Sequence, residues 1–315
     1  MKKVALLLLV HKNKTQLERL LAAFQHKNLD IFIHLDSKCP FAPSDISAKN
    51  VIFTEKRYDV GLFEFSMVDA EMELIRTARR HGDYSYFLLM SGQCYPVWKV
   101  EDICDFLHRS YPKPFIEIIT PDSKNRFRKV FNHTYLMKRF KLNSYAFLKQ
   151  HFRDSAFSRL RYLPGSFVLA VSRIKELFSH SPGHRLEAMG IQPFFGPQWW
   201  ALPDTVMDHV EQMYGSRQYV KAISDCYSCD ETFFQTALMM KPEQFGISLN
   251  EAGQWKGLLW YQVFVQGHPI ILTKADYDRI LTSGKPFARK FDADTDTEIL
   301  DLLDQNRMIK EEVSA

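Results

Sequence analysis

Residues 3–10, Lys-Val-Ala-Leu-Leu-Leu-Leu-Val, form an unbroken apolar run after one lysine. An unbroken run, rather than an alternation of apolar and polar residues, is typical of a β-strand that is covered on both faces. The run is too short to span a bilayer. Residues 11–14, His-Lys-Asn-Lys, follow it without the small residues of a signal-peptide cleavage site. We therefore expect a buried first strand in a cytoplasmic protein.

Further strands and helices alternate after this first run. Short apolar runs predict strands at residues 31–35, 51–54, 84–90, 115–119, 166–171, 196–203 and 269–272. Helical spacing predicts helices at residues 15–24, 65–80, 100–108, 173–179, 204–214, 230–238 and 274–281. A capping box at Thr15 is expected to begin the first helix. Strands that alternate with helices indicate an α/β sandwich built on a mostly parallel central sheet, here as one domain over residues 1–315.

Polar residues follow three of the predicted strands. His11 follows the first, Asp36 the second, and Ser91 with Gly92 the strand at 84–90. The carboxyl ends of parallel strands share one edge of the sheet, where ligands of α/β proteins bind. Asp36 is suited to a ribose hydroxyl or a uracil edge, and a simple turn residue is the alternative. The chain has no GxGxxG or GxxxxGK[ST] sequence, so we expect neither dinucleotide nor P-loop chemistry.

An acid pair opens an otherwise apolar helix at residues 229–238, Cys-Asp-Glu-Thr-Phe-Phe-Gln-Thr-Ala-Leu. Asp230 is expected to cap this helix by accepting N–H groups of its first turn. Glu231, backed by Phe233 and Phe234, is a candidate general base, because apolar surroundings raise the pKa of a carboxyl group toward neutrality. The alternative is that both acids lie at the start of a helix without any catalytic role.

A basic loop is expected at residues 284–292, Gly-Lys-Pro-Phe-Ala-Arg-Lys-Phe-Asp. Arg289 and Lys290 together can neutralise a diphosphate, and a solvated loop is the alternative. Three acids at alternate positions could bind Mg²⁺ or Mn²⁺ instead: Asp292, Asp294 and Asp296. Because two cations precede these acids, we favour diphosphate binding over a metal site.

Aromatic residues make up 14% of the chain, enough to supply both a core and a sugar-binding cleft. The candidates for stacking on a pyranose ring are Trp199, Trp200, Trp255, Trp260 and Tyr261. Core packing is the alternative for each of them. The cysteines are odd in number and scattered, which argues against a disulfide framework, and the lone Cys226-Tyr-Ser-Cys229 pair lacks the partners of a zinc site.

The net charge of +4 is small, but it is unevenly distributed along the chain. Residues 124–161 are rich in Lys and Arg, and Asp154 is their only acid. A cluster of one sign attracts anions, so this stretch is suited to an anionic acceptor or to lipid headgroups, with a solvated helix face as the alternative. We expect a cytoplasmic protein that can lie against the inner face of the membrane through residues 124–161, and no nucleic-acid partner.

Six segments resemble, in the same order, those of one known family. They are residues 10–12, 31–38, 86–96, 196–202, 230–236 and 287–292. Together they are similar to the core-2/I-branching and peptide O-xylosyltransferase group, glycosyltransferase family 14, over nearly the whole chain. The resemblance implies a GT-A-like, Rossmann-type α/β fold. It also implies a transferase that inverts the anomeric centre of a UDP-sugar without a metal ion or other cofactor.

The resemblance further implies roles for particular residues. Glu231 would deprotonate the acceptor hydroxyl, and Lys290 would neutralise the diphosphate in place of a divalent ion. The implied donor site contains Val10, His11, Lys12, Asp36, Lys38, Ser66, Arg289 and Lys290. The implied acceptor site contains Glu117, Arg126, Trp199, Asp230 and Trp260. Residues 1–121 would form the nucleotide-binding half of the domain, and residues 122–315 the acceptor-binding and catalytic half.

The chain departs from the family pattern at two places that bear on the donor sugar. A diphosphate-binding arginine of the N-acetylglucosaminyl branch is replaced near His268, and an aromatic residue is missing near Leu62. Without the membrane anchor and disulfides of the animal members, the chain is expected to be a bacterial-type member. The expected donor carries GlcNAc or xylose, and the expected acceptor is a glycan, a lipooligosaccharide or a glycopeptide. The alternatives are a metal-dependent transferase that uses Asp292 and Asp294, and a non-catalytic sugar- or lipid-binding module on the same fold.

Overall fold

A five-stranded sheet lies at the centre of the computed structural model, which describes residues 2–120, 182–224, 226, 228–265 and 268–312. The order of its strands is β3 (Val51–Phe53), β2 (Leu29–Leu35), β1 (Lys3–Val10), β4 (Tyr84–Ser91) and β7 (Trp200–Pro203). The first four run parallel, and β7 pairs antiparallel with β4. The expected mostly parallel α/β sheet is confirmed.

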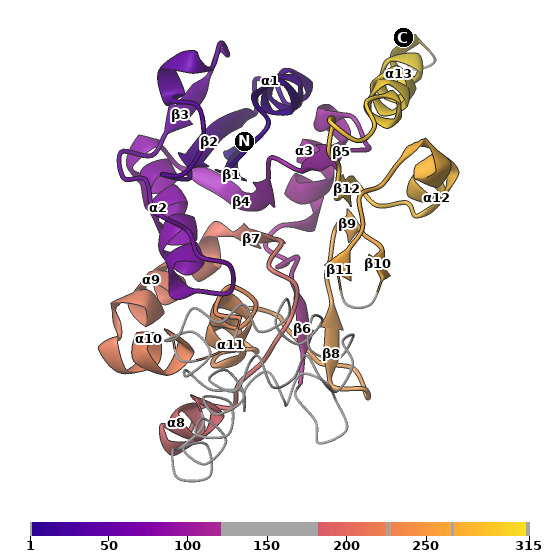
Figure 1. The fold of residues 1–315 in the computed structure, drawn as a ribbon. Coiled ribbons are helices and arrows are strands. Elements are labelled where there is room, and N and C mark those ends of the chain that lie inside the picture. The colour runs from indigo at the N-terminus through magenta and orange to yellow at the C-terminus, as the bar shows by residue number, and fades with distance from the viewer. Residues whose placement is uncertain (1, 121–181, 225, 227, 266–267, 313–315) are drawn as a thin grey trace, which may run out of the picture.

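Helices cover both faces of this sheet (Figure 1). On one face α2 (Phe65–His81) packs against β1, β2 and β4. α9 (Met207–Gly215) extends this layer, because the hydroxyl of Tyr214 donates to Asp69 of α2 at 2.7 Å. On the other face α1 (Lys14–Ala23) lies beside α3 (Val100–Ser110), and a side-chain contact of 3.4 Å joins His26 to Glu101. The central strands are therefore shielded from water on both sides.

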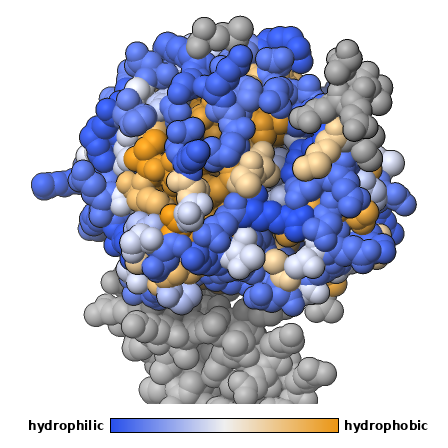
Figure 2. Space-filling model, turned by 90° about the horizontal axis from the view of Figure 1, so that it is seen from above, coloured by the Kyte–Doolittle hydropathy of each residue, from blue (hydrophilic) through white to orange (hydrophobic). Residues whose placement is uncertain are grey.

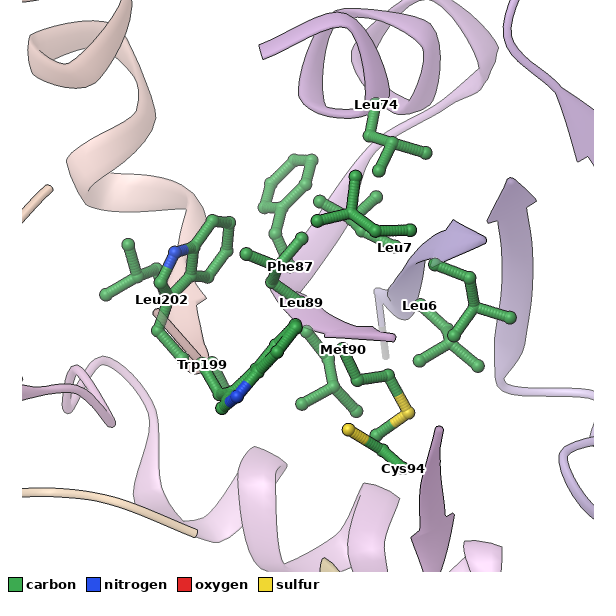
Figure 3. Close-up of a cluster of buried hydrophobic side chains, with 14 of the residues drawn as sticks. Leu6, Leu7, Leu74, Phe87, Leu89, Met90, Cys94, Trp199 and Leu202 are labelled. Carbon is green, nitrogen blue, oxygen red and sulfur yellow. The ribbon is translucent and has the colours of Figure 1, made fainter. Parts of the chain in front are cut away.

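The core is built around β1, in which every residue after Lys3 is buried. Figure 3 shows Leu6 and Leu7 of β1 among apolar side chains from α2, β4 and β7, with Leu74 near Leu7, and with Leu202 and Trp199 on the side of the cluster opposite Leu6. Full burial of one such leucine stabilises the fold by about 1.5–3 kcal/mol. This burial is why an unbroken apolar run, and not an alternating one, forms the first strand.

The remaining elements of the described residues surround the sheet. The other helices are α8 (Pro182–Ala188), α10 (Arg217–Ser224), α11 (Phe233–Met239), α12 (Tyr277–Thr282) and α13 (Glu298–Glu312), with 3₁₀ turns at Pro43–Asp45, Asp204–Val206 and Lys274–Asp276. The other strands are β5 (Cys94–Pro96), β6 (Glu117–Ile119), β8 (Gln254–Lys256), β9 (Trp260–Tyr261), β10 (Phe264–Val265), β11 (His268–Pro269) and β12 (Phe287–Arg289). These strands form three small sheets, β5-β12-β9, β6-β8 and β10-β11.

Two helices begin at different residues from those expected. α1 begins at Lys14 and not at a capping box on Thr15, because the side chain of Asn13 accepts the N–H of Gln16 at 3.0 Å. Asn13 has φ of 57°, a left-handed conformation that asparagine tolerates. α11 begins at Phe233 with Thr232 at its N-cap position, so the expectation that Asp230 caps this helix is wrong.

Two predicted segments near the C-terminal end also differ. The basic loop expected at residues 284–292 contains β12, which pairs antiparallel with β5 and parallel with β9. The strand expected at 269–272 is reduced to Pro269, which belongs to β11. Strands of two or three residues depend on their partners more than on local sequence pattern, so they escape prediction. The strand and helix predicted between 166 and 179 lie outside the described residues.

The described residues contain neither a helix that could cross a membrane nor a disulfide. No helix in them combines the length and the apolar character that a membrane crossing requires. Cys39, Cys94, Cys104, Cys226 and Cys229 are all buried thiols. The expectation that the cysteines do not form a disulfide framework is therefore confirmed.

Candidate active site

The carboxyl ends of β1, β2 and β4 lie side by side. The register pairs Val10 with Leu35, and Leu9 with Ser91. The N–H of Asp36 donates to the carbonyl of Val10 at 2.9 Å, and the N–H of Gly92 donates to the carbonyl of Leu9 at 3.0 Å. The residues that follow these strands therefore share one edge of the sheet, as the sequence predicts.

Asp36 organises the turn that follows β2. Its carboxylate is buried and accepts the N–H of Lys38 at 2.8 Å and the N–H of Val60 at 3.3 Å. The ammonium of Lys38 donates to the carbonyl of Val60 at 2.8 Å and pairs with Asp59. Ser66, at the start of α2, accepts the N–H of Gly61 at 2.9 Å. Asp36, Lys38 and Ser66 therefore border one loop, residues 57–61, beside the strand ends.

A basic cluster, formed by His11, Lys12 and Lys290, lies at this edge. Burial lowers the pKa of Lys290, and the charges of Arg289 and Lys12 lower it further. The pKa of His11 is also lowered, first by burial and then by Lys12 and Lys290. Like charges that depress one another's pKa values are relieved by a bound anion. The basic cluster is therefore suited to hold phosphate groups.

Gln16 and Gln93 fix the loop that carries Lys290 against the strand ends. The Nε2 of Gln16 donates to the carbonyls of Gly92 at 2.9 Å and Phe291 at 3.2 Å, and its Oε1 accepts the N–H of Ala293 at 2.7 Å. The N–H of Phe291 donates to the carbonyl of Gln93 at 2.9 Å. Sequence reasoning missed both glutamines. One signal was available for Gln16, which occupies the apolar stripe of α1 one turn before Leu20.

The acids that follow Lys290 already have partners within the chain. The carboxylate of Asp292 lies 2.6 Å from the ammonium of Lys12, and this hydrogen bond is the main reason that the pKa of Asp292 is lowered. Asp296 accepts the N–H of Glu298 at 2.8 Å at the start of α13 and the N–H of Lys274 at 2.8 Å. Across the described residues there is no group of three or more His, Cys, Asp or Glu side chains that could hold a metal ion.

The acidic turn, Asp230 and Glu231, lies directly before α11. The N–H of Gly196 donates to the carbonyl of Glu231 at 3.0 Å. A Cβ atom on residue 196 would lie 1.9 Å from the carbonyl oxygen of Glu117, so this close approach requires glycine. Burial raises the pKa of the Glu117 carboxyl, and Lys285 and Lys256 oppose this shift. The predicted acceptor residue Glu117 and the predicted base Glu231 therefore lie on either side of Gly196.

Arg289 connects the acidic turn with the basic cluster. Its guanidinium lies over the ring of Trp199, 4.2 Å from the ring centroid, and Figure 3 shows Trp199 close to Met90 and Cys94. Burial lowers the pKa of Arg289, and interactions with Cys94 and Glu231 oppose this shift. The next residue, Lys290, belongs to the basic cluster. The last residue of β12 is thus within electrostatic range of the predicted base, and the residue after it belongs to the predicted phosphate site.

Three of the tryptophans considered for stacking on a sugar pack inside the protein, which is the alternative that the sequence left open, and the acceptor role of Trp199 and Trp260 stays a prediction. Trp199, Trp200 and Trp260 are only 4%, 0% and 2% exposed. The ring of Trp260 stacks on Phe287 with centroids 5.1 Å apart, and the ring of Trp200 lies 4.9 Å from that of Phe234. Trp255 and Tyr261 remain partly exposed. Arg126 and the basic stretch 124–161 lie outside the described residues.

Apolar surface is nevertheless present on the outside of the molecule. On the face seen in Figure 2, hydrophobic residues gather inside a rim of hydrophilic ones. The mostly parallel α/β sheet, with a basic cluster at its carboxyl edge, is consistent with a GT-A-like fold.

The chain belongs to the Core-2/I-Branching enzyme family, whose model matches residues 4–256. This family uses nucleotide-sugar donors and glycan acceptors in general. The match includes Glu231 and Asp36, whereas Trp260, Arg289 and Lys290 follow its last matched residue. Comparison with curated proteins gave no match.

Proposed function

We propose that this enzyme moves a sugar, GlcNAc or xylose, from UDP to a hydroxyl of a glycan acceptor, with inversion to a β-linkage and without a metal ion. Glu231 is the general base, and Lys290 neutralises the diphosphate. One observation carries this proposal above all others. Arg289 lies within electrostatic range of Glu231, and the adjacent Lys290 lies within electrostatic range of His11 and Lys12, so neighbouring residues of one strand end lie near the proposed base and the proposed phosphate site.

The reaction requires one proton acceptor and one site for negative charge. The acceptor oxygen attacks C1 of the sugar as the carboxylate of Glu231 takes its proton. The bond from C1 to the diphosphate oxygen breaks on the opposite side, and its electron pair leaves with UDP. A positioned base contributes about 10²–10⁴-fold to the rate. Fixed cations at the leaving group stabilise charge as it develops, which is the role we assign to Lys290.

The nucleotide would bind along the carboxyl edge of the sheet. Its base and ribose would contact Val10 and the turn at Asp36 and Lys38, near Ser66. Its diphosphate would contact the basic cluster. The glycan would approach from the side of Glu117 and Asp230, where the acidic turn meets Gly196. An anionic acceptor such as a lipooligosaccharide would in addition be attracted by residues 124–161, which supports contact with the inner face of an anionic membrane.

The decisive experiment substitutes the proposed base and leaves the donor site intact. Glu231→Gln should lower the rate of sugar transfer by about 10³-fold or more while the Kd for UDP, measured by calorimetry, stays within about twofold. The exposed Glu243 lies shortly after α11, and Glu243→Gln is the matched control with unchanged turnover. Turnover in Glu231→Gln close to that of the wild type would remove Glu231 from the mechanism.

Two further assays address the metal and the donor. Transfer should be the same in EDTA as in Mn²⁺, because Lys290 supplies the charge at the diphosphate. Activity that disappears in EDTA and returns with Mn²⁺ would assign this role to a metal instead. The protein should be tested in a thermal-shift panel with UDP-GlcNAc, UDP-xylose, UDP-glucose and UDP-galactose. The true donor should raise its melting temperature most, because stabilisation grows with the logarithm of the ratio of ligand concentration to Kd.

A further inference from the structure

A glutamate is completely buried beside the acidic turn. Glu71 of α2 is 0% exposed, and its helix neighbours Val68, Met72 and Ile75 are fully buried apolar residues. The Oε1 of Glu71 accepts the side-chain N–H of Gln198 at 2.6 Å, and its Oε2 has no hydrogen-bond partner among the described residues. The site described above does not use this carboxyl group.

The surroundings of Glu71 favour its neutral form. A carboxylate without water is strongly disfavoured, and a second acid nearby disfavours it further. Burial and the charge of Asp230 both raise the pKa of Glu71 well above its ordinary value, opposed only by the hydrogen bond from Gln198. These surroundings favour the protonated acid, which has one O–H group that it can donate.

Gln198 links Glu71 to the predicted base through a short segment, residues 196–198. At one end of this segment, the N–H of Gly196 donates to the carbonyl of Glu231 at 3.0 Å. The side chain of Gln235 in α11 donates to the carbonyls of Gly196 and Pro197 at 3.2 and 3.0 Å. Glu71 thus acts on the acidic turn from two directions, through segment 196–198 and through Asp230.

We propose that Glu71 is a positioning residue, which holds segment 196–198 and the acidic turn where Glu231 can reach an acceptor hydroxyl. This role rests on the proposed function of Glu231. Because Glu71 is fully buried, it acts through Gln198 and Asp230 and does not touch the substrate. Correct placement matters for the rate, since a shift of about 1 Å in a catalytic group can lower it by about 10²-fold.

Two substitutions of Glu71 separate its hydrogen bonds from its volume. In Glu71→Gln the amide oxygen can still accept from Gln198, so kcat should stay within about twofold. Glu71→Leu fills the space but leaves the buried donor of Gln198 unpaired. Its kcat should fall by about 10- to 100-fold while the KM for the donor stays within about twofold.

A matched control comes from the same helix. Glu73 accepts from Arg80 at 3.3 Å and its side chain is 15% exposed, so Glu73→Gln makes the same substitution in α2 away from segment 196–198 and should not alter kcat. If Glu71→Leu does not fold, Gln198→Ala removes the same hydrogen bond from the other side and should lower kcat in the same way. Carbon-13 NMR of the Glu71 carboxyl should report the neutral acid at pH 7.

Several outcomes would overturn the proposal for Glu71. They are a wild-type kcat in folded Glu71→Leu or Gln198→Ala, an equal loss of kcat in Glu71→Gln and Glu71→Leu, or an ionised Glu71 carboxyl at pH 7. The proposed function fails on a different result, namely turnover in Glu231→Gln, so the two proposals can be judged separately.

Discussion

Arg289 and Lys290 are adjacent in the chain, yet their side chains have different surroundings. The guanidinium of Arg289 lies over Trp199 and interacts with Glu231, whereas the ammonium of Lys290 joins His11 and Lys12. The sequence alone assigns both residues to the diphosphate. The structure places Lys290 in the basic cluster and gives Arg289 neighbours in Trp199, Cys94 and Glu231.

Removal of the Lys290 charge should weaken nucleotide binding. A hydrogen bond to a charged group contributes about 1.5–3 kcal/mol, so Lys290→Met should raise the Kd for UDP by about 10- to 100-fold in calorimetry. Lys274→Met is the matched control, because Lys274 is exposed and pairs with Glu298, which is not a member of the basic cluster. An unchanged UDP affinity in Lys290→Met would separate Lys290 from the diphosphate.

His34 makes the stability of the strand edge dependent on pH. It is 1% exposed, its Nε2 accepts the N–H of Tyr58 at 2.9 Å, and burial lowers its pKa from 6.5 to about 4. The folded state therefore holds the neutral ring. The neutral His34 ring makes its full contribution to the free energy of unfolding above pH 6.5. As the pH falls toward 4, the free energy of unfolding decreases by about 3 kcal/mol, because the unfolded state gains a proton that the folded state does not bind.

Urea unfolding at several pH values measures this effect. The wild type should lose stability between pH 7 and 4.5, and His34→Gln should lose less over the same interval. His268→Gln, at an exposed histidine, should retain the wild-type pH dependence. Parallel curves for the wild type and His34→Gln would show that His34 does not contribute to it.

At the scale of the elements, the contact between Gly196 and β6 joins the acidic turn to the small sheet β6-β8. A methyl group at residue 196 would lie 1.9 Å from the Glu117 carbonyl, which is backbone and cannot rotate away. Gly196→Ala should lower the free energy of unfolding by about 2 kcal/mol or more and reduce kcat, because the turn with Glu231 must move. Gly215→Ala is the control, since a Cβ at Gly215 meets nothing within 4 Å.

Sequence pattern predicted the long elements and missed those that depend on distant partners. The strands β1, β2 and β4 can be recognised in the sequence, because buried strands consist mostly of apolar residues. β12 could not be found in this way, since its three residues become a strand only between β5 and β9. The role of Glu71 was also hidden, although a lone acid in the apolar stripe of residues 65–80 was a readable signal.

The candidate site was predictable in its charged residues but not in the groups that position them. Asp36, Glu231 and Lys290 stand out because their chemistry is explicit in the sequence. Gln16 and Gln198 do not, because an uncharged amide acquires its function only from the carbonyls and carboxyls that folding brings to it. The acceptor role of Trp199 and Trp260 stays a prediction, because both rings are buried in the protein and an indole ring suits a core as well as a sugar.

At the scale of the whole molecule, the C-terminal segment returns to the carboxyl edge of the central sheet. β12 pairs with β5, and α13 is fastened to α1 by Arg19, which lies 2.6 Å from both Asp301 and Asp304. The hydroxyl of the buried Tyr95 donates a hydrogen bond to Asp304 at 2.8 Å. Lys290 therefore reaches the basic cluster from near the other end of the chain, beyond the residues that the family model matches.

Two substitutions distinguish fastening of this segment from placement of Lys290. Asp304→Ala removes contacts to Arg19 and Tyr95 but leaves the Gln16 hydrogen bonds, so it should lower the free energy of unfolding by about 1–3 kcal/mol without changing UDP affinity. Gln16→Leu removes the bonds to Gly92, Phe291 and Ala293 that hold the loop of Lys290. It should lower stability to a similar degree and also raise the Kd for UDP by about tenfold.

Calorimetry and urea unfolding on the same two variants decide between these effects. Equal stability loss with weaker UDP binding only in Gln16→Leu would mean that α1 sets the position of Lys290 directly. Equal UDP affinity in both variants would mean that Lys290 does not need this anchor. We expect the first result, in which only Gln16→Leu weakens UDP binding. Gln16 is 2% exposed and its side chain bonds both to Gly92, after β4, and to Ala293, in the loop that follows Lys290. Water cannot replace these buried hydrogen bonds when the side chain is removed.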